Sequence, residues 1–186
     1  MKEQLARIGA IENITVPLRN MKKILLIICL FTVVVNGHSQ NDSLQPPYKR
    51  FPSFPPAKLL LPDSVTYFTK KDLDKKKPSM LMMFNPKCEH CQHETEELIK
   101  HIDQFKNIQI VMTTSMLFDS MMAFREKYKL AQYKNIVVAQ DANYFLFSFY
   151  LNHSLPFLAF YNQKMELISV FEGGLPMDKV LKELGK

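Results

Sequence analysis

From residue 63 onwards, the apolar and polar positions of the chain follow in turn the period of a strand and the period of a helix. Continuous apolar runs at 79–84 and 108–113 are typical of strands buried in the middle of a sheet. Further strands are predicted at 64–69, 136–139, 157–161 and 167–171. Helices are predicted from 87 to about 105, and at 117–128, 142–151 and 177–184. This order predicts an α/β fold with a mixed central sheet that has helices on both faces.

The preceding segment, residues 40–62, lacks this periodicity and contains six prolines. Proline has no backbone N–H and interrupts both helices and ladders, so we expect an extended linker that leads into a domain spanning 63–186. The aromatic residues Tyr48, Phe51 and Phe54 could dock on that domain, in which case the linker would not be fully loose.

The first 39 residues have the features of a secretory signal peptide. A basic start at 21–23 precedes an unbroken apolar run at 24–35, and small residues occupy positions 37 and 39. The run is shorter than the roughly 20 residues that span a bilayer. We therefore expect translation from Met21, cleavage after Ser39 and a periplasmic protein. The alternatives are an uncleaved anchor, which would tether the protein to the membrane, and a buried helix.

The net charge of the chain is informative mainly through where the charged residues lie. The chain has 186 residues, of which 47% are hydrophobic and 23% charged, which is close to the globular average. Its formal net charge is +6, but the predicted leader holds half of it, with five basic and two acidic residues. The rest is nearly balanced and has no basic stripe with interleaved aromatics. Nucleic acid is therefore not an expected partner.

Two cysteines three positions apart carry the candidate chemistry. Removal of the signal peptide removes Cys29 and leaves Cys88 and Cys91, where the predicted strand meets the following helix. They are expected to pair in an oxidising compartment. A loop this small constrains the unfolded chain little, so redox chemistry explains the pair better than a structural staple. The helix N-terminus would stabilise a thiolate at Cys88, which would attack a partner's disulfide, and Cys91 would resolve the mixed disulfide.

Residues around the cysteines are expected to tune this chemistry. Lys87 and a protonated His90 would favour the thiolate of Cys88, and Glu89 would oppose it. Such a reaction needs no bound cofactor, but net reduction requires an electron donor, for which we expect a membrane dithiol carrier. Haem attachment would need a histidine directly after the second cysteine, and that residue is Gln92.

At these residues the sequence resembles the thioredoxin superfamily, and within it the secreted thiol–disulfide oxidoreductases of the TlpA/ResA type. The resemblance covers most of 63–186 and rests on four features: the strand ending at Phe84, Cys88-Glu89-His90-Cys91, Glu94, and Ser154-Leu155-Pro156. It implies a thioredoxin-like fold in which Pro156 is a cis-proline facing the dithiol and Leu155 binds substrate backbone. The helix at 142–151 would belong to a segment inserted before this proline. The implied partners are proteins that carry disulfides or dithiols.

Two positions depart from the family pattern and concern substrate preference more than fold. Lys87 stands where the family usually has tryptophan, and Leu155 stands where a small or β-branched residue is common. The direction of electron flow stays open, because the resemblance favours a reductase whereas His90 favours an oxidant by stabilising the reduced thiolate.

The same residues allow other functions. His90, His93 and His101 could join Cys88 and Cys91 in a site for Cu(I) or zinc, although a closed zinc site usually has a second pair of ligands elsewhere. The dithiol could also be a relic that only stabilises the fold. A peroxidase would need threonine or serine three residues before its reactive cysteine, where this chain has Asn85 before Cys88.

Acidic residues near the motif have both a catalytic and a structural interpretation. Glu94, Glu96 and Glu97 could relay protons, but acids in the first turns of a helix more often interact with its dipole and with solvent. Asp141 and Asn143 are expected to act as turn and helix-cap residues.

Overall fold

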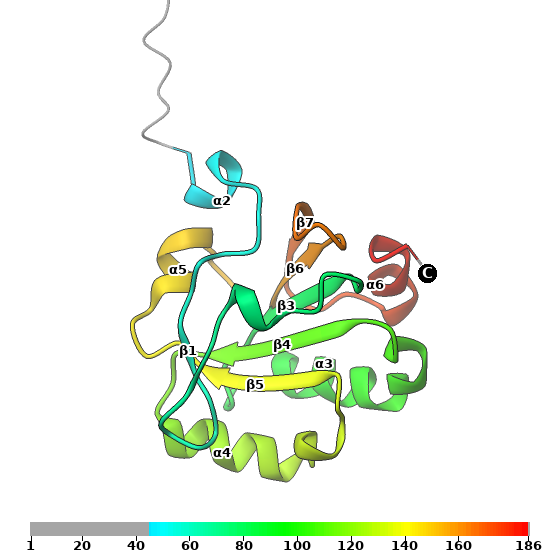
Figure 1. Ribbon diagram of the computed structural model, residues 1–186. Helices are drawn as coiled ribbons and strands as arrows, with labels where there is room; N and C mark the ends of the chain where they lie inside the picture. The colour runs from blue at the N-terminus through cyan, green and yellow to red at the C-terminus, as the bar shows by residue number, and fades with distance from the viewer. Residues whose placement is uncertain (1–44, 186) are drawn as a thin grey trace, which may run out of the picture. The chain divides into compact units, whose positions relative to one another are not determined.

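The computed structural model describes residues 45–185, in which helices lie on both faces of a seven-stranded sheet (Figure 1). The predictions for the leader, 1–39, and for positions 40–44 fall outside the described residues. The strands are β1 (Leu59–Leu60), β2 (Tyr67–Phe68), β3 (Ser79–Met83), β4 (Gln109–Thr114), β5 (Ile136–Gln140), β6 (Phe157–Tyr161) and β7 (Leu167–Glu172). Their order across the sheet is β2-β1-β5-β4-β3-β6-β7.

The α-helices in this part of the chain are α2 (Pro47–Arg50), α3 (Glu89–Lys100), α4 (Phe118–Lys127), α5 (Phe145–Tyr150) and α6 (Met177–Glu183). Short 3-10 helices lie at η3 (Lys70–Asp72), η4 (Ile102–Phe105) and η5 (Leu130–Gln132). No helix among these is both long and apolar enough to cross a membrane.

The sheet combines parallel and antiparallel pairs, which confirms the predicted mixed α/β architecture. β3 pairs in parallel with β4, and β4 pairs in parallel with β5. Parallel neighbours need long crossover connections, and α3 and α4 provide them. β6 lies antiparallel to β3 on its other side and forms an antiparallel hairpin with β7.

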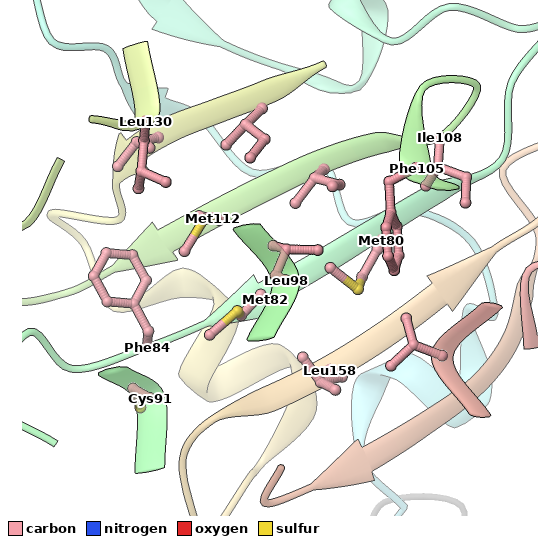
Figure 2. Packing of buried hydrophobic residues seen from close by; sticks show 14 of the residues in the cluster. Met80, Met82, Phe84, Cys91, Leu98, Phe105, Ile108, Met112, Leu130 and Leu158 are labelled. Atoms are coloured by element: carbon pink, nitrogen blue, oxygen red, sulfur yellow. The ribbon is translucent and has the colours of Figure 1, made fainter. Parts of the chain in front are cut away.

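Alternate residues of each central strand pack into two separate cores, one on each face of the sheet. Along β3, Met80 and Met82 pack with α3, α4 and α6, whereas Leu81 and Met83 pack with α5 and the segment before β1. Figure 2 shows the first core, in which Met82 lies beside Met112 of β4. The methionines of these strands therefore fill apolar space, as expected for a flexible thioether side chain.

The extended linker expected at 40–62 is not found in its described part, 45–62, where the alternative of aromatic docking on the domain holds for Phe54. Residues 47–50 form α2 and 59–60 form β1, which joins the sheet beside β5. Phe54 and Leu59 are only 2% and 1% exposed in the second core, and the ring of Phe54 lies 5.0 Å from that of Tyr161. Proline limits regular hydrogen bonding but not the burial of apolar side chains between the prolines, so the folded domain begins near residue 45, not 63.

The edge strand predicted at 64–69 is shorter than expected, because a turn occupies its first half. The carboxylate of Asp63 accepts hydrogen bonds from the backbone N–H groups of Val65 and Thr66, at 3.0 and 2.8 Å. This local pairing of an aspartate with the backbone competes with a strand. β2 is therefore limited to Tyr67–Phe68.

The helix predicted at 142–151 also begins later, at Phe145. The buried carboxylate of Asp141 accepts from the N–H groups of Phe145 and Leu146, at 3.1 and 2.8 Å. Asp141 thus satisfies N–H groups at the start of α5, as expected of a cap, although Tyr144 occupies the N-cap position itself. The helix carries Leu146, Phe149 and Tyr150 into the second core.

Candidate active site

The two cysteines of the motif lie at the junction of β3 and α3, near the centre of the sheet. Cys88 is the N-cap residue of α3, with extended backbone angles, and the N–H of Gln92 donates to its carbonyl oxygen at 3.0 Å. Both cysteines are thiols; Cys88 is partly exposed, whereas Cys91 is fully buried. In Figure 2 Cys91 lies next to Phe84, at the border of the first core. The prediction that both cysteines lie at the start of the helix that follows a buried strand is therefore confirmed.

The loop before β6 lies against the exposed thiol. The Leu155–Pro156 peptide bond is cis. The Cys88 thiol donates to the carbonyl oxygen of Leu155, with a distance of 3.8 Å between sulfur and oxygen. The structure therefore brings together Cys88, Leu155 and Pro156, which are far apart in the sequence.

Cys91 lies in an environment that keeps its thiol protonated. Burial is the main cause that raises the pKa of Cys91 from 9.0 to about 12, with smaller contributions in the same direction from the thiol and charge of Cys88 and from the charge of Glu94. The backbone at Asn85 acts in the opposite direction. Cys91 can therefore act as a nucleophile only after a nearby base has accepted its proton.

Glu94 lies one helical turn beyond Cys91 in α3 and is only 5% exposed. Burial raises the pKa of its carboxyl from 4.5 to about 7, with a smaller contribution in the same direction from Glu97. The N–H of Leu175, which donates to Glu94 Oε2 at 3.1 Å, and the charge of His93 act in the opposite direction. The sequence indicated Glu94 through the family resemblance and as one of three acids that could relay protons, although contact with solvent was the favoured expectation. The burial of Glu94 contradicts that expectation, and its contact with Leu175, 81 positions away, had no signal in the sequence.

The three residues expected to tune the dithiol lie on the surface. Lys87, Glu89 and His90 are exposed. In the described part of the chain their side chains form no hydrogen bond or ion pair with either cysteine. Their expected influence is therefore limited to electrostatics through solvent.

A cavity of about 380 Å³ opens beside Cys88 and Leu155. Its wall includes Met116 from the loop after β4, together with Tyr144 and Phe147 from the start of α5. All three side chains are exposed, although they are large and apolar or aromatic. Nothing in the sequence indicated these residues, because periodicity assigns apolar residues to a core and cannot distinguish those that remain at the surface.

Glu172, at the end of β7, holds the loop that precedes Pro156. Its Oε2 accepts hydrogen bonds from the N–H groups of His153 and Ser154, at 3.2 and 3.0 Å, and from Ser154 Oγ at 3.0 Å. Nothing in the sequence pattern signalled this contact across 18 to 19 positions. It fixes the backbone immediately before the residue that touches Cys88.

The alternative metal site gains no support from the described residues. Between residues 45 and 185, no group of three or more His, Cys, Asp or Glu side chains is arranged so that it could hold an ion. His90 and His93 point to the exposed surface of α3 and His101 ends that helix, where its Nδ1 lies 2.9 Å from the carbonyl oxygen of Glu97.

Comparison with known proteins identifies the fold. No family model and no curated protein sequence matches the chain. The structure of dsbF from Mycobacterium tuberculosis has a TM-score of 0.59 and 18% identity, covering 70% of this chain and 93% of that one. A secreted M. tuberculosis disulfide oxidoreductase homologous to E. coli DsbE gives 0.57 and 18%, with 70% and 95% covered. The exposed lipoprotein thioredoxin Etrx1 of Streptococcus pneumoniae gives 0.51 and 24%, with 68% and 98% covered.

The chain therefore has a thioredoxin-like fold, as the resemblance implied. At these identities the likeness concerns the fold, and one fold can serve several activities. The activity of this protein must be inferred from the chemistry of Cys88, Cys91 and their surroundings.

Proposed function

We propose that the protein is a thiol–disulfide oxidoreductase that exchanges disulfides with client proteins. The observation that carries this proposal is the placement of Cys88: a partly exposed thiol at the N-terminus of α3, in contact with the Leu155 carbonyl and backed by the buried Cys91. Unpaired N–H groups at a helix N-terminus favour a thiolate there. Two thiols in this relation can transfer two electrons to a disulfide without a bound cofactor.

The first step joins the protein to its client. The thiolate of Cys88 attacks one sulfur of a client disulfide, so that a Cys88–client disulfide forms and the second client sulfur leaves as a thiolate. In the second step Cys91 loses its proton and attacks Cys88 Sγ. The Cys88–Cys91 disulfide forms, and the client is released with both sulfurs reduced. The reverse sequence oxidises a client dithiol.

We assign to Glu94 the role of proton acceptor for Cys91. The pKa of Cys91, raised to about 12 by burial, makes its thiol inert without a base. The pKa of Glu94, raised to about 7 by burial, allows its carboxylate to accept a proton near neutral pH and to release it again. The negative charge of Glu94 also raises the pKa of Cys91. Protonation of Glu94 therefore favours ionisation of the Cys91 thiol.

The cavity beside Cys88 gives a client its route to the thiol. An extended client segment could bind along Leu155 and Pro156, as the family resemblance implies, with neighbouring apolar side chains against Met116 and Phe147. Exposed apolar surface of this kind commonly marks a site of protein binding. The electron donor that completes a reductive cycle would be a membrane dithiol carrier.

We further propose that the protein works outside the cytoplasm, in the periplasm. The predicted signal peptide supports this location. Among the structures with the same fold, one belongs to a protein described as secreted and another to one described as an exposed lipoprotein. An oxidising compartment would also supply disulfide-bearing clients.

The proposal is tested by insulin reduction with the full chain in a Cys29→Ser background, which leaves only the two thiols of the motif. This protein should accelerate insulin reduction by dithiothreitol, and Cys88→Ser should reduce the rate to that of dithiothreitol alone. Equal rates for the two proteins would reject the proposed activity. Zinc or copper bound at one equivalent, and lost on changing either cysteine, would instead favour the metal-binding alternative.

A further inference from the structure

The four residues from the last position of β7 onwards, Glu172 to Leu175, contact both halves of the candidate active site. At one end, Glu172 holds the backbone of Ser154, and the N–H of Gly173 donates to the carbonyl oxygen of Pro156 at 2.8 Å. At the other end, the N–H of Leu175 donates to Glu94 Oε2 at 3.1 Å. We call residues 172–175 the bridging segment, because it joins the loop beside Cys88 to the acid near Cys91.

The two glycines of the bridging segment are required for different reasons. Gly173 has φ +87°, a conformation that favours glycine, and a Cβ built there would have no atom within 4 Å. Gly174 has an ordinary φ, but its Cβ would lie 2.7 Å from Glu94 Oε2 and 3.8 Å from Cδ. A side chain at 174 is thus excluded by the Glu94 carboxyl and not by the backbone.

Neither partner of this close contact can move away freely. The N–H of Gly173 is hydrogen-bonded to the carbonyl oxygen of Pro156, and the carboxylate of Glu172 is hydrogen-bonded to the loop before Pro156. Glu94 as a whole is 5% exposed, and its carboxyl accepts a hydrogen bond from the N–H of Leu175, the residue that follows Gly174. A methyl group at 174 would therefore displace the carboxyl oxygen and weaken its bond to the Leu175 N–H.

We propose that Gly174 is a positioning residue for the thiol–disulfide reaction: by lacking a side chain it lets the Leu175 N–H bind the Glu94 carboxylate, and so sets the proton affinity of the group that serves Cys91. This inference rests on the proposed function. Gly174 acts through Glu94 and does not touch the sulfurs.

The charged and titratable groups that act on Glu94 determine the direction of the effect. From α3 these are Cys91, His93 and Glu97, and the bridging segment contributes the Leu175 N–H. A hydrogen bond donated to a carboxylate stabilises its charged form. Weakening that bond in a buried site therefore raises the pKa of Glu94.

The test compares Gly174→Ala with the unchanged protein, both in the full chain with Cys29→Ser and with the dithiol reduced. The carboxyl of Glu94, labelled with ¹³C, is titrated by NMR. The midpoint should rise by about one pH unit in Gly174→Ala, the amount expected for one hydrogen bond to a charged group. The low-pH limb of the insulin-reduction profile should move in the same direction. An unchanged or lowered midpoint would overturn the proposal.

Glu94→Asp provides the matched background, because its carboxyl ends one methylene short of residue 174. In Glu94→Asp the further change Gly174→Ala should leave the midpoint of residue 94 within about 0.3 pH unit, which is the signature of a coupled pair in a double-mutant cycle. If Gly174→Ala alone does not fold, folding of Glu94→Asp/Gly174→Ala supports the steric conflict, and failure of both to fold rejects it. The titration does not depend on catalysis, so a protein inactive on insulin defeats the proposed function alone.

Discussion

The thiol of Cys88 meets the carbonyl oxygen of Leu155 at 3.8 Å across 67 positions of sequence. The register of the sheet explains this contact. β3 and β6 are antiparallel neighbours, and Met83 at the end of β3 is paired with Phe157 at the start of β6. Residues that follow β3 and residues that precede β6 must therefore meet at the same end of these two strands. Strand pairing alone thus brings the motif and the loop before Pro156 together.

The difference between the two thiols predicts selective alkylation. Iodoacetamide should modify Cys88 much faster than Cys91 in the reduced protein near neutral pH, because Cys91 is buried and its pKa is raised to about 12. Peptide mapping by mass spectrometry identifies the modified residue, and denatured protein, in which both should react, is the control. Comparable rates at the two sites in the folded protein would contradict the assignment of roles.

Loss of the Glu172 carboxylate should weaken client binding. Glu172→Ala removes three hydrogen bonds to the loop before Pro156 and should raise the KM for insulin several-fold with little change in kcat. Steady-state kinetics in the Cys29→Ser background measure both constants. Glu166→Ala, at the other end of the β6–β7 hairpin, is the matched control and should leave KM as it is. An equal fall in kcat for Glu172→Ala would instead place the residue in the chemical step.

Glu94 should make the stability of the protein depend on pH between about 4.5 and 7. Burial raises its pKa from 4.5 to about 7, so that in this window the folded protein binds a proton that the unfolded chain has lost. The free energy of unfolding should therefore fall as pH rises through the window, by up to about 3 kcal/mol. Urea denaturation of reduced wild type and Glu94→Gln should reveal a difference that changes with pH. A difference in free energy of unfolding that stays constant from pH 4 to 8 would refute this role of Glu94. The control is Glu89→Gln, an exposed change in the same helix, whose pH dependence should follow that of the wild type.

The proline-rich segment should contribute strongly to stability. Phe54→Ala should lower the free energy of unfolding by about 3–5 kcal/mol, because its ring is 2% exposed and packs on Tyr161. Phe51→Ala, three residues earlier and 59% exposed, should change it by no more than about 0.5 kcal/mol. Chemical denaturation of the two variants distinguishes a folded segment from a linker, for which both changes would be small.

The central strands and the helices that follow them could be predicted from the sequence, because each has a long and unambiguous pattern. The continuous apolar run at 79–84 corresponds to β3 and the run at 108–113 to β4, with shifts of one residue. Cys88 could be placed at a helix N-terminus for the same reason, since the strand before it and the helix after it were both clear.

Other features depend on contacts that no local pattern contains. The segment with Phe54 has too many prolines to show a period. Its aromatic residues indicated that it could dock, but the contact with Tyr161 of β6 that buries Phe54 has no local signal. The environment of Glu94 depends on Leu175, and the position of the loop before Pro156 depends on Glu172. In each case the partner lies on a separate element, so only the folded topology reveals it.

The outer strands of the sheet have a consequence for a protein that handles other polypeptides. A free sheet edge can recruit an extended chain by strand addition. Here β2 contributes only Tyr67–Phe68 to one edge and is followed by Lys70 and Lys71. At the other edge, the N–H of Leu167 at the start of β7 donates to the carbonyl oxygen of Pro52 at 2.9 Å. A client chain in extended form therefore finds little backbone to pair with at β2 or at the start of β7, and at these places no ladder of newly made strand bonds opposes the release of the client.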